Sequence, residues 1–370
     1  MSVKLDFATD WQSILAFVEN IEPLKYAKTR NYIHGDVSYL SPYISRGFIS
    51  TRYVLERVLA KGYGISEIES FVKELCWRDY FQRLAQHKNL DFEIKNPQID
   101  VQNNAISTAI VLAQTSIEGI DLSIKNLYQT GYMHNHARMY TAALACNIAR
   151  SHWKMPAKWM FYHLLDADWA SNACSWQWVA ATNSSKKYFA NQENINRYTE
   201  TFQSNTFLDF SYEKLPELPV PDILKNTEML DLKTILPPKR HVTIDDSLPV
   251  FLYDFYNLDP NWHASESGNR VLILEPTFFE KYPVSTRTID FIFKLSDNIP
   301  DMQVFVGNFD DFIQEYSIAN LYFKEHPHLT HYKGIRESRD WIAPSINGYY
   351  PSFFAYWKVV EKYLHQNYKH

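Results

Sequence analysis

Glycine and cysteine are both scarce in this chain of 370 residues. There are 10 glycines, and the region after about residue 243 contains no glycine-rich phosphate loop. The three cysteines lie far apart and lack the paired spacing of a zinc or iron–sulfur site, so we expect buried thiols and no bound metal. They are Cys76, Cys146 and Cys174.

Long apolar runs are also missing. No run reaches the ~18 residues that a membrane-spanning helix needs. The first residues carry Asp6 and Asp10, where a secretory signal would be basic and then apolar. We therefore expect a cytoplasmic monomer that makes no contact with a membrane.

A strong positive charge is absent as well. The net charge of −5 argues against a general nucleic-acid binder, but the charges are unevenly distributed. Between Leu122 and Gln192 the only acids are Asp166 and Asp168. A polyanion could bind this segment, and a solvated basic face explains the same pattern. Its basic residues are Lys125, Arg138, Arg150, Lys154, Lys158, Lys186 and Lys187.

The apolar pattern predicts a mainly α protein in two parts. In the first 200 residues apolar positions recur every three or four residues, without a convincing alternating strand. This spacing predicts helices at Trp11–Val18, Thr51–Leu59, Ile65–Leu84, Met139–Ile148 and Trp159–Trp169. Ser50 or Thr51 can cap the second of these helices, and Gly131 breaks the chain before the fourth.

The rest of the chain predicts a small parallel α/β unit. Apolar runs at Val250–Asp254, Val271–Glu275, Gln303–Val306 and Asn320–Phe323 alternate with helical patterns at Ser285–Ser296 and Asp310–Ile318. Tyr349–Tyr363 predicts an aromatic-rich helix. We therefore expect an all-helical domain over residues 1–205, a proline-rich linker over 206–245, and an α/β domain of unknown role over 246–370.

Several polar residues are spaced so that they can surround one cavity. Arg138 follows Asn135 by three residues on one predicted helix, and Asp166, Asp168 and Asn172 can line another wall. Since an isolated carboxylate is costly in apolar surroundings, we expect Asp166 to pair with Arg138. Such a pair can hold the polar edge of a ring-shaped ligand, and a structural salt bridge explains the same residues.

The sequence motifs resemble those of the DNA photolyase/cryptochrome family. Thr130–Met139 (TGYMHNHARM) and Leu164–Trp178 (LLDADWASNACSWQW) resemble its flavin-binding signatures. Three earlier segments also match, in the order in which the family has them. They are Tyr26–Arg30 (YxxxR), Leu40–Ser50 (LSPYISRGFIS) and Glu74–Phe81 (ELCWRDYF). The resemblance covers roughly residues 10 to 200 and implies an all-helical FAD-binding domain of the photolyase type.

The resemblance implies FAD as the cofactor and assigns contacts to it. Asp168 and Asp166 match acids at the edge of the ring, and Asn172 matches the residue beside the ring nitrogen that is protonated on reduction. An amide there tolerates an anionic reduced flavin, whereas a carboxylate would repel it. The cofactor-binding residues implied are Tyr26, Ser38, Leu40, Ser41, Arg138, Asp166, Asp168 and Asn172.

The resemblance also implies a DNA site for cyclobutane pyrimidine dimers. Trp77 and Trp178 match the tryptophans that enclose a flipped dimer, although each taken singly is explained by core packing. Reduced FAD would pass one electron to the dimer after absorbing light, and the residues implied in catalysis are Glu74, Asn135, Met139, Asn172, Trp176 and Trp153. Residues implied in DNA binding are Arg30, Glu74, Trp77, Arg78, Asn135, His136, Met139, Trp178, Lys186 and Lys187.

This chain departs from the family pattern in four respects. Trp176 and Trp153 match the first two tryptophans of the electron path, but no tryptophan lies between Trp77 and Trp153 to supply the third. Tyr128, Tyr162 or Trp159 are candidate substitutes, with packing as the other explanation. His136 stands where the family has a phosphate-binding arginine, and Tyr188–Ala190 replaces a segment that ends in arginine. We also expect a short form of the family, in which the α/β domain that binds antenna pigments does not precede the helical part.

We therefore predict light-driven, FAD-dependent repair of cyclobutane dimers, in single- or double-stranded DNA, by a photolyase-like lyase. Weakened phosphate contacts favour single strands, which cost less to unstack. The alternatives are a cryptochrome-like blue-light signalling flavoprotein without repair activity, and a nucleic-acid binder that has lost FAD.

Overall fold

The computed structural model describes residues 6–318 and 320–368, which form two compact units. Unit 1 contains residue 6 and residues 28–37 and 88–232, and unit 2 contains the other described residues. This division differs from the sequential domains expected above, because helices from the first 90 residues group with the C-terminal region. Each unit is described by itself.

Unit 1 is largely helical, and the prediction of a mainly α fold with a C-terminal α/β region is confirmed. Its short strands β1 (Ile106–Ser107) and β2 (Thr227–Glu228) pair antiparallel, and two-residue strands leave no alternating pattern to detect. Its helices are α6 (Thr108–Val111), α7 (Glu118–Thr130), α8 (Asn135–Ala143), the π-helical η1 (Leu144–Ile148), α9 (Lys154–His163), α10 (Trp169–Val179), α11 (Gln192–Thr199) and the 3-10 turns η2 (Leu215–Glu217) and η3 (Asp222–Leu224).

The prediction of one helix over Trp159–Trp169 is wrong. Helix α9 ends at His163 because Leu164 has extended backbone angles, with φ −79° and ψ 133°. Helix α10 then begins after Asp168, whose carboxylate accepts a hydrogen bond from the backbone N–H of Ser171 at 3.2 Å. The residues between the two helices are therefore a loop, and this loop carries Asp166.

Unit 2 begins with helices that the periodicity located well. The cap predicted for α4 is confirmed, since the Ser50 side chain accepts a hydrogen bond from the N–H of Tyr53 at 3.0 Å. Helix α5 starts four residues later than predicted. The helices from this part of the chain are α1 (Trp11–Glu19), α2 (Pro23–Thr29, whose last residues belong to unit 1), α3 (Ser41–Ser45), α4 (Thr51–Leu59) and α5 (Glu69–Ala85).

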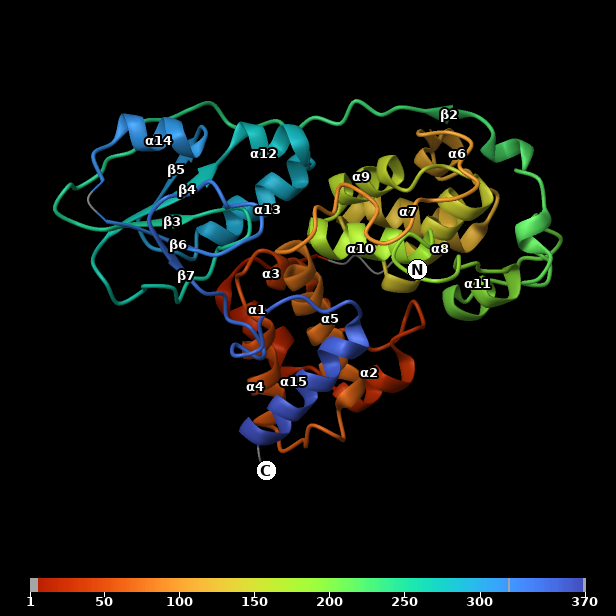
Figure 1. Cartoon of the computed structure of the whole chain (residues 1–370), viewed down its shortest axis with the longest axis horizontal. Helices are drawn as coiled ribbons and strands as arrows, with labels where there is room; N and C mark the ends of the chain where they lie inside the picture. Colours follow the sequence, from red (N-terminus) through yellow and green to blue (C-terminus); the bar gives the residue numbers. More distant parts are fainter. Residues whose placement is uncertain (1–5, 319, 369–370) are drawn as a thin grey trace. The chain divides into compact units, whose positions relative to one another are not determined.

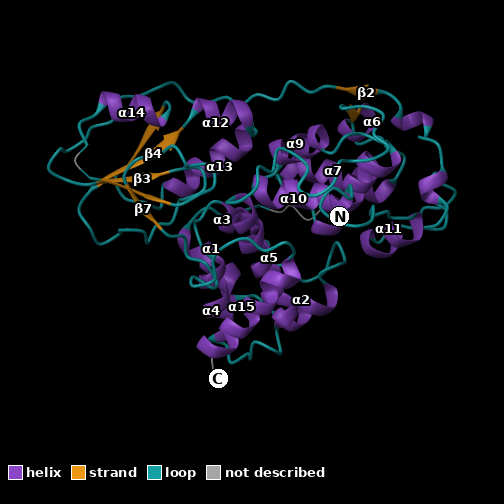
Figure 2. Cartoon of the chain, in the orientation of Figure 1, coloured by secondary structure: helices purple, strands orange, loops and turns teal. Residues whose placement is uncertain are grey.

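The C-terminal part of unit 2 is built on one parallel sheet, whose strands are orange in Figure 2. The strand order is β5-β4-β3-β6-β7 (labelled in Figure 1). Strands β3 and β4 are buried along their whole length, as expected of a parallel sheet covered on both faces. The four predicted strands are confirmed, and the short β7 and α12 are additional. The elements are β3 (Val250–Tyr253), β4 (Asn269–Leu274), α12 (Pro276–Lys281), α13 (Thr286–Ser296), β5 (Met302–Val306), α14 (Phe309–Glu315), β6 (Leu321–Lys324), β7 (Ile335–Glu337) and α15 (Phe353–Asn367).

Helix α5 is joined to the C-terminal residues of the chain. The buried carboxylate of Asp79 accepts hydrogen bonds from the Thr51 hydroxyl and the Ile342 backbone N–H, both at 2.8 Å. The guanidinium of Arg83 lies 3.7 Å from the ring centroid of Trp341. Helix α15 packs along α5 (Figure 1). These contacts explain why α4 and α5 group with the C-terminal part.

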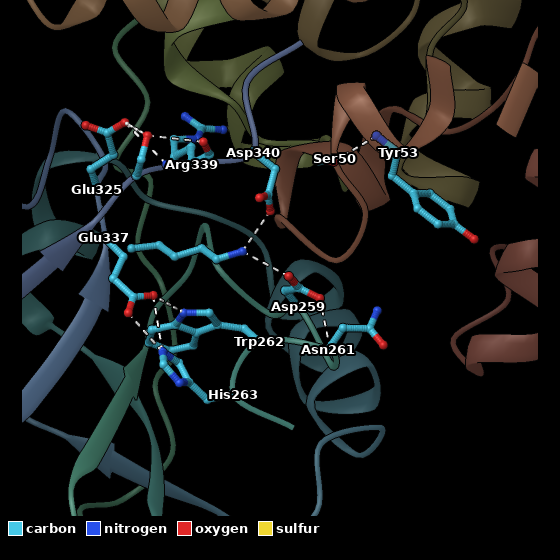
Figure 3. A network of polar contacts seen from close by, with 12 residues as sticks. Ser50, Tyr53, Asp259, Asn261, Trp262, His263, Glu325, Glu337, Arg339 and Asp340 are labelled. Carbon is cyan, nitrogen blue, oxygen red and sulfur yellow. Dashed lines mark hydrogen bonds and ion pairs between the residues drawn. The ribbon is translucent and has the colours of Figure 1, made fainter. Parts of the chain in front are cut away.

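A polar network fixes the loop after β3 to the edge strand β7. The Trp262 indole donates to Glu337 at 2.7 Å, and the imidazole of His263 lies 3.0 Å from the same carboxylate (Figure 3). The ammonium of Lys324 pairs with Asp259 and Asp340, each at 2.9 Å. These contacts tie the loop after β3 to strands β6 and β7.

Candidate functional site

The polar set predicted around Arg138 comes together in unit 1. The Arg138 guanidinium lies 2.9 Å from the Asp166 carboxylate, and its Nε donates to the Met133 carbonyl at 2.8 Å. The Asp166 side chain is 6% exposed and that of Arg138 is 22% exposed. The predicted pairing is therefore confirmed, and its low exposure shields the pair from solvent.

The backbone around Asp166 holds this carboxylate in place. Gly131 ends α7 in the left-handed conformation, with φ 75°. Its carbonyl accepts a hydrogen bond from the N–H of Leu165 at 2.9 Å, which ties the loop between α9 and α10 to the end of α7. The glycine that the sequence marks as a helix breaker thus also anchors the residue before Asp166.

Asn172 lies on the first turn of α10 and is buried. Its Nδ2 donates to the Ala157 carbonyl on α9 at 2.8 Å, so its carbonyl oxygen Oδ1 is the acceptor end of the amide. Asp168, which caps the same helix, accepts from both the N–H and the hydroxyl of Ser171 at 3.2 Å. The amide predicted to lie beside a ring nitrogen therefore has a fixed orientation.

The tryptophans predicted for electron transfer are buried in unit 1. Trp153 and Trp176 are both almost fully buried, and the Trp153 indole donates to Glu93 at 3.4 Å. The tryptophan ring beside Trp153 is that of Trp169, at 6.2 Å between centroids and 32° between planes. Trp159 instead donates to the Tyr128 hydroxyl at 3.0 Å. Sequence reasoning missed Trp169, whose aromatic side chain at the start of α10 was the available signal.

In unit 1, the residues predicted to contact a DNA lesion are more exposed than the tryptophans predicted for electron transfer. Trp178 is 42% exposed, and its ring lies 5.6 Å from that of Tyr188. Asn135 is exposed at the start of α8, and Met139 is partly buried one turn later. An exposed indole beside a tyrosine is a surface on which a base can stack.

The basic residues of unit 1 are less available than their number implies. Lys187 pairs with Asp100 at 2.9 Å and donates to the Ile99 carbonyl, whereas Lys186 is exposed. Burial and the nearby Arg30 cation lower the pKa of His136 to about 4, so its imidazole is neutral at pH 7. Because a neutral imidazole carries no charge to attract a phosphate, His136 does not replace an arginine electrostatically.

The remaining predicted residues lie in unit 2. The Arg78 guanidinium donates to the Ser45 hydroxyl and to the Ser41 carbonyl, the latter at 3.4 Å, which links α5 to α3. The Tyr26 ring packs edge-on against Phe71 at 5.3 Å. The predicted residues in this unit are Tyr26, Ser38, Leu40, Ser41, Glu74, Trp77 and Arg78, and the others lie in unit 1.

Trp77 has an aromatic partner that sequence reasoning missed. The ring of Phe353, the first residue of α15, lies 3.7 Å from the Trp77 ring between centroids, with 10° between planes. This is a face-to-face stack, the arrangement that a nucleic-acid base would adopt on the same indole. The aromatic richness of the last predicted helix was a signal, but not for this contact.

The α/β part of unit 2 contains a cavity of about 190 Å³ at the carboxyl ends of its strands. Its lining includes Asp254, Tyr256, Glu275, Phe278 and His328. Burial raises the pKa of Asp254 to about 7, and its Oδ1 accepts from the Tyr256 N–H at 2.6 Å. Sequence reasoning assigned no chemistry to this region.

The part of the chain that the structure describes contains neither a cluster of metal ligands nor a membrane-spanning helix. Among residues 6–318 and 320–368, no group of three or more His, Cys, Asp or Glu side chains is placed to hold a metal ion. No helix within these ranges is long and apolar enough to cross a membrane.

Comparisons with known proteins point to one family. Residues 71–228 match the family model of the FAD binding domain of DNA photolyase. A deoxyribodipyrimidine photo-lyase of Agrobacterium fabrum is 30% identical over 188 residues, which cover 49% of this chain and 39% of that protein. Cryptochrome DASH of Solanum lycopersicum is 31% identical over 188 residues, which cover 47% of this chain and 32% of that protein.

A solved structure of a bacterial class III photolyase from Agrobacterium tumefaciens is 25% identical, with a TM-score of 0.40. The match covers 50% of this chain and 44% of that one. The chain spans about a third to two fifths of the length of the curated relatives it matches.

Proposed function

Given that residues 71–228 belong to the photolyase/cryptochrome family and form its FAD-binding domain, we propose that this protein repairs cyclobutane pyrimidine dimers in DNA under blue light. The observation that carries the proposal is the Arg138–Asp166 pair at 2.9 Å, together with the oriented amide of Asn172 in the same unit. These groups can supply the donors and the acceptor that the polar edge of a flavin ring would use.

The residues of unit 1 suit the polar edge of a flavin ring. Arg138 offers donors to ring carbonyl oxygens, and its charge is balanced by Asp166, so a neutral ring binds without leaving an unpaired charge. The Oδ1 of Asn172 can accept from a protonated ring nitrogen. When bound and reduced, FAD supplies the electron that light-driven cleavage requires, and no side chain acts as a nucleophile.

The dimer would be held by stacking and by a few polar contacts. Trp178 is 42% exposed and offers a stacking face, which is worth ~1–3 kcal/mol for each base. Asn135 is exposed at the N-terminus of α8, where its amide can bind a base edge or stabilise added negative charge on it. Met139 supplies an apolar contact one turn along the same helix.

Single-stranded DNA is the substrate form that the charges favour. His136 is neutral at pH 7, and Lys187 is occupied by Asp100, which leaves fewer cations to neutralise phosphates. Since each phosphate contact adds to both the affinity and its salt dependence, we expect weak duplex binding with a shallow salt slope. A single strand places its bases outside a duplex without the unpairing cost.

A cryptochrome-like signalling flavoprotein is the second candidate, and a specific contact favours it. Phe353 already stacks on Trp77 at 3.7 Å, so one of the two predicted lesion tryptophans is occupied by the chain itself. A flavoprotein that only responds to light needs no open slot for a dimer. Both candidate functions use FAD, and they differ in whether the protein removes dimers from DNA under blue light.

A repair assay separates them. The purified holoprotein is reduced chemically and illuminated with blue light in the presence of oligonucleotides that carry one thymine dimer, either single-stranded or in a duplex. Dimer loss in the light and none in the dark supports repair, with faster loss expected from the single strand. A yellow protein that leaves the dimers intact under these conditions supports the signalling alternative.

A further inference from the structure

The stack between Trp77 and Phe353 closes one face of a residue that is predicted to bind bases. Their rings are 3.7 Å apart and nearly parallel, at 10°. Phe353 is 3% exposed, whereas Trp77 keeps part of its surface accessible. The edge of Tyr80 and the tilted ring of Phe81, at 5.7 and 5.2 Å, complete the surroundings of the indole. A base can therefore reach the covered face only where Phe353 now lies.

Phe353 is buried, but it lies in the first turn of a helix, where fewer backbone hydrogen bonds hold the chain than at a helix centre. It is the first residue of α15, so its backbone N–H has no partner in the preceding turn of the helix. The turn is held by the Ser352 cap, which accepts from the Ala355 N–H at 3.2 Å. The segment before it is attached through a long hydrogen bond, 3.3 Å from the Tyr80 hydroxyl to the Tyr350 carbonyl. Helix ends held in this way open more readily than helix centres.

The next residue of the helix has very different surroundings. Phe354 is 71% exposed, and its ring makes an edge-on contact with Phe353 at 5.8 Å between centroids. Two adjacent phenylalanines thus differ in burial and in access to Trp77, although they share one helical turn. The difference provides a matched control.

We propose that Phe353 determines which substrates engage the covered face of Trp77, because a base must displace the phenyl ring in order to stack on that face of the indole. A base inside a duplex must leave its own stack and also displace Phe353, so it is excluded. An unpaired base, or a dimer that has left the duplex, needs only to displace Phe353. This inference rests on the proposed function, since it takes Trp77 as a base-stacking residue.

The test measures binding in the dark, so that no repair takes place. Fluorescence anisotropy is recorded with three labelled oligonucleotides: a single strand with one thymine dimer, the same strand undamaged, and an undamaged duplex. Phe353→Ala is compared with the wild type, with Phe354→Ala, and with the pair Trp77→Ala and Trp77→Ala/Phe353→Ala. Because an aromatic pair of this kind contributes ~0.5–1.5 kcal/mol, removing the competitor should tighten binding of both single strands about 2- to 13-fold.

The double variant separates competition from a general structural effect. If the ring competes for the indole, the gain from Phe353→Ala disappears in the Trp77→Ala background, and duplex binding does not change. Should Phe353→Ala unfold the protein, Phe353→Leu keeps the apolar volume without a planar face and should show a smaller gain of the same sign. Circular dichroism establishes which variant is folded.

Three results would overturn the inference: unchanged affinity for the dimer strand in the folded variant, a gain that persists without Trp77, or an equal gain in Phe354→Ala. These outcomes differ from failure of the proposed function, which is read from dimer loss under light. If the binding assay shows the competition but no dimers are lost under light, this inference is supported and the repair proposal is refuted. If no variant prefers the dimer strand to the undamaged one, the lesion slot is refuted, whereas the competition is judged from the gain in Phe353→Ala and its loss in the Trp77→Ala background.

Discussion

Replacing Asp166 with asparagine tests whether the Arg138–Asp166 pair is a working part of the site. The substitution keeps the shape and one acceptor oxygen but removes the negative charge that balances Arg138. Breaking a buried ion pair costs ~3–5 kcal/mol and breaking an exposed one ~0–1 kcal/mol. Asp166 is 6% exposed and Arg138 is 22% exposed, so a loss of about 1–3 kcal/mol in the free energy of unfolding is expected.

Urea denaturation followed by circular dichroism measures this loss, and the flavin absorbance of the same preparations gives the FAD content. Asp100→Asn is the matched control, because its pair with Lys187 has the same 2.9 Å distance but a carboxylate that is 63% exposed. We expect Asp166→Asn to lose stability and FAD, and Asp100→Asn to retain both. Equal behaviour of the two variants would refute the assignment of the Arg138–Asp166 pair to the flavin site.

Two further substitutions test other parts of the account. Because burial raises the pKa of Asp254 from 3.8 to about 7, the folded state holds its proton more tightly than the unfolded state, and this group makes the protein less stable as pH rises from about 4 to about 7. The free energy of unfolding should fall by up to ~1.4 kcal/mol per pH unit because of this group. Asp254→Asn should lack this fall when the free energy of unfolding is measured across the same pH range. Parallel plots of unfolding free energy against pH for the two proteins would contradict the argument from burial. Trp178→Ala should weaken dark binding of the dimer strand by ~1–3 kcal/mol, measured by anisotropy against Trp159→Phe, whose buried ring offers no face to DNA; unchanged affinity would remove Trp178 from the lesion slot.

Local sequence patterns predicted most of the helices and strands. The Ser50 cap, the Gly131 break and the buried strands at 250–253 and 269–274 depend on neighbouring residues only, so they can be recognised without tertiary information. The prediction of one helix across Trp159–Trp169 was wrong because the apolar spacing continues through the loop between α9 and α10. The Asp168 cap determines where α10 begins.

The part of the candidate site that depends on charge pairing could be predicted from the sequence. The Arg138–Asp166 pair follows from the cost of an isolated buried carboxylate, which holds in any fold that buries the residue. The contacts of Trp77 with Phe353 and of Trp153 with Trp169 were not predictable, because they join segments whose approach is set by packing. The grouping of α4 and α5 with the C-terminal part depends in the same way on long-range contacts such as Asp79 with Ile342.

Light-driven dimer loss in the wild type and in Asn172→Asp is the most direct test of the central claim. A carboxylate at position 172 would repel an anionic reduced flavin, whereas the amide accepts a hydrogen bond from it without this repulsion. We expect the reduced wild-type holoprotein to remove dimers from a single strand under blue light, and a folded, FAD-containing Asn172→Asp to remove them far more slowly. Intact dimers with the wild type, or equal rates for the two proteins, would contradict the account.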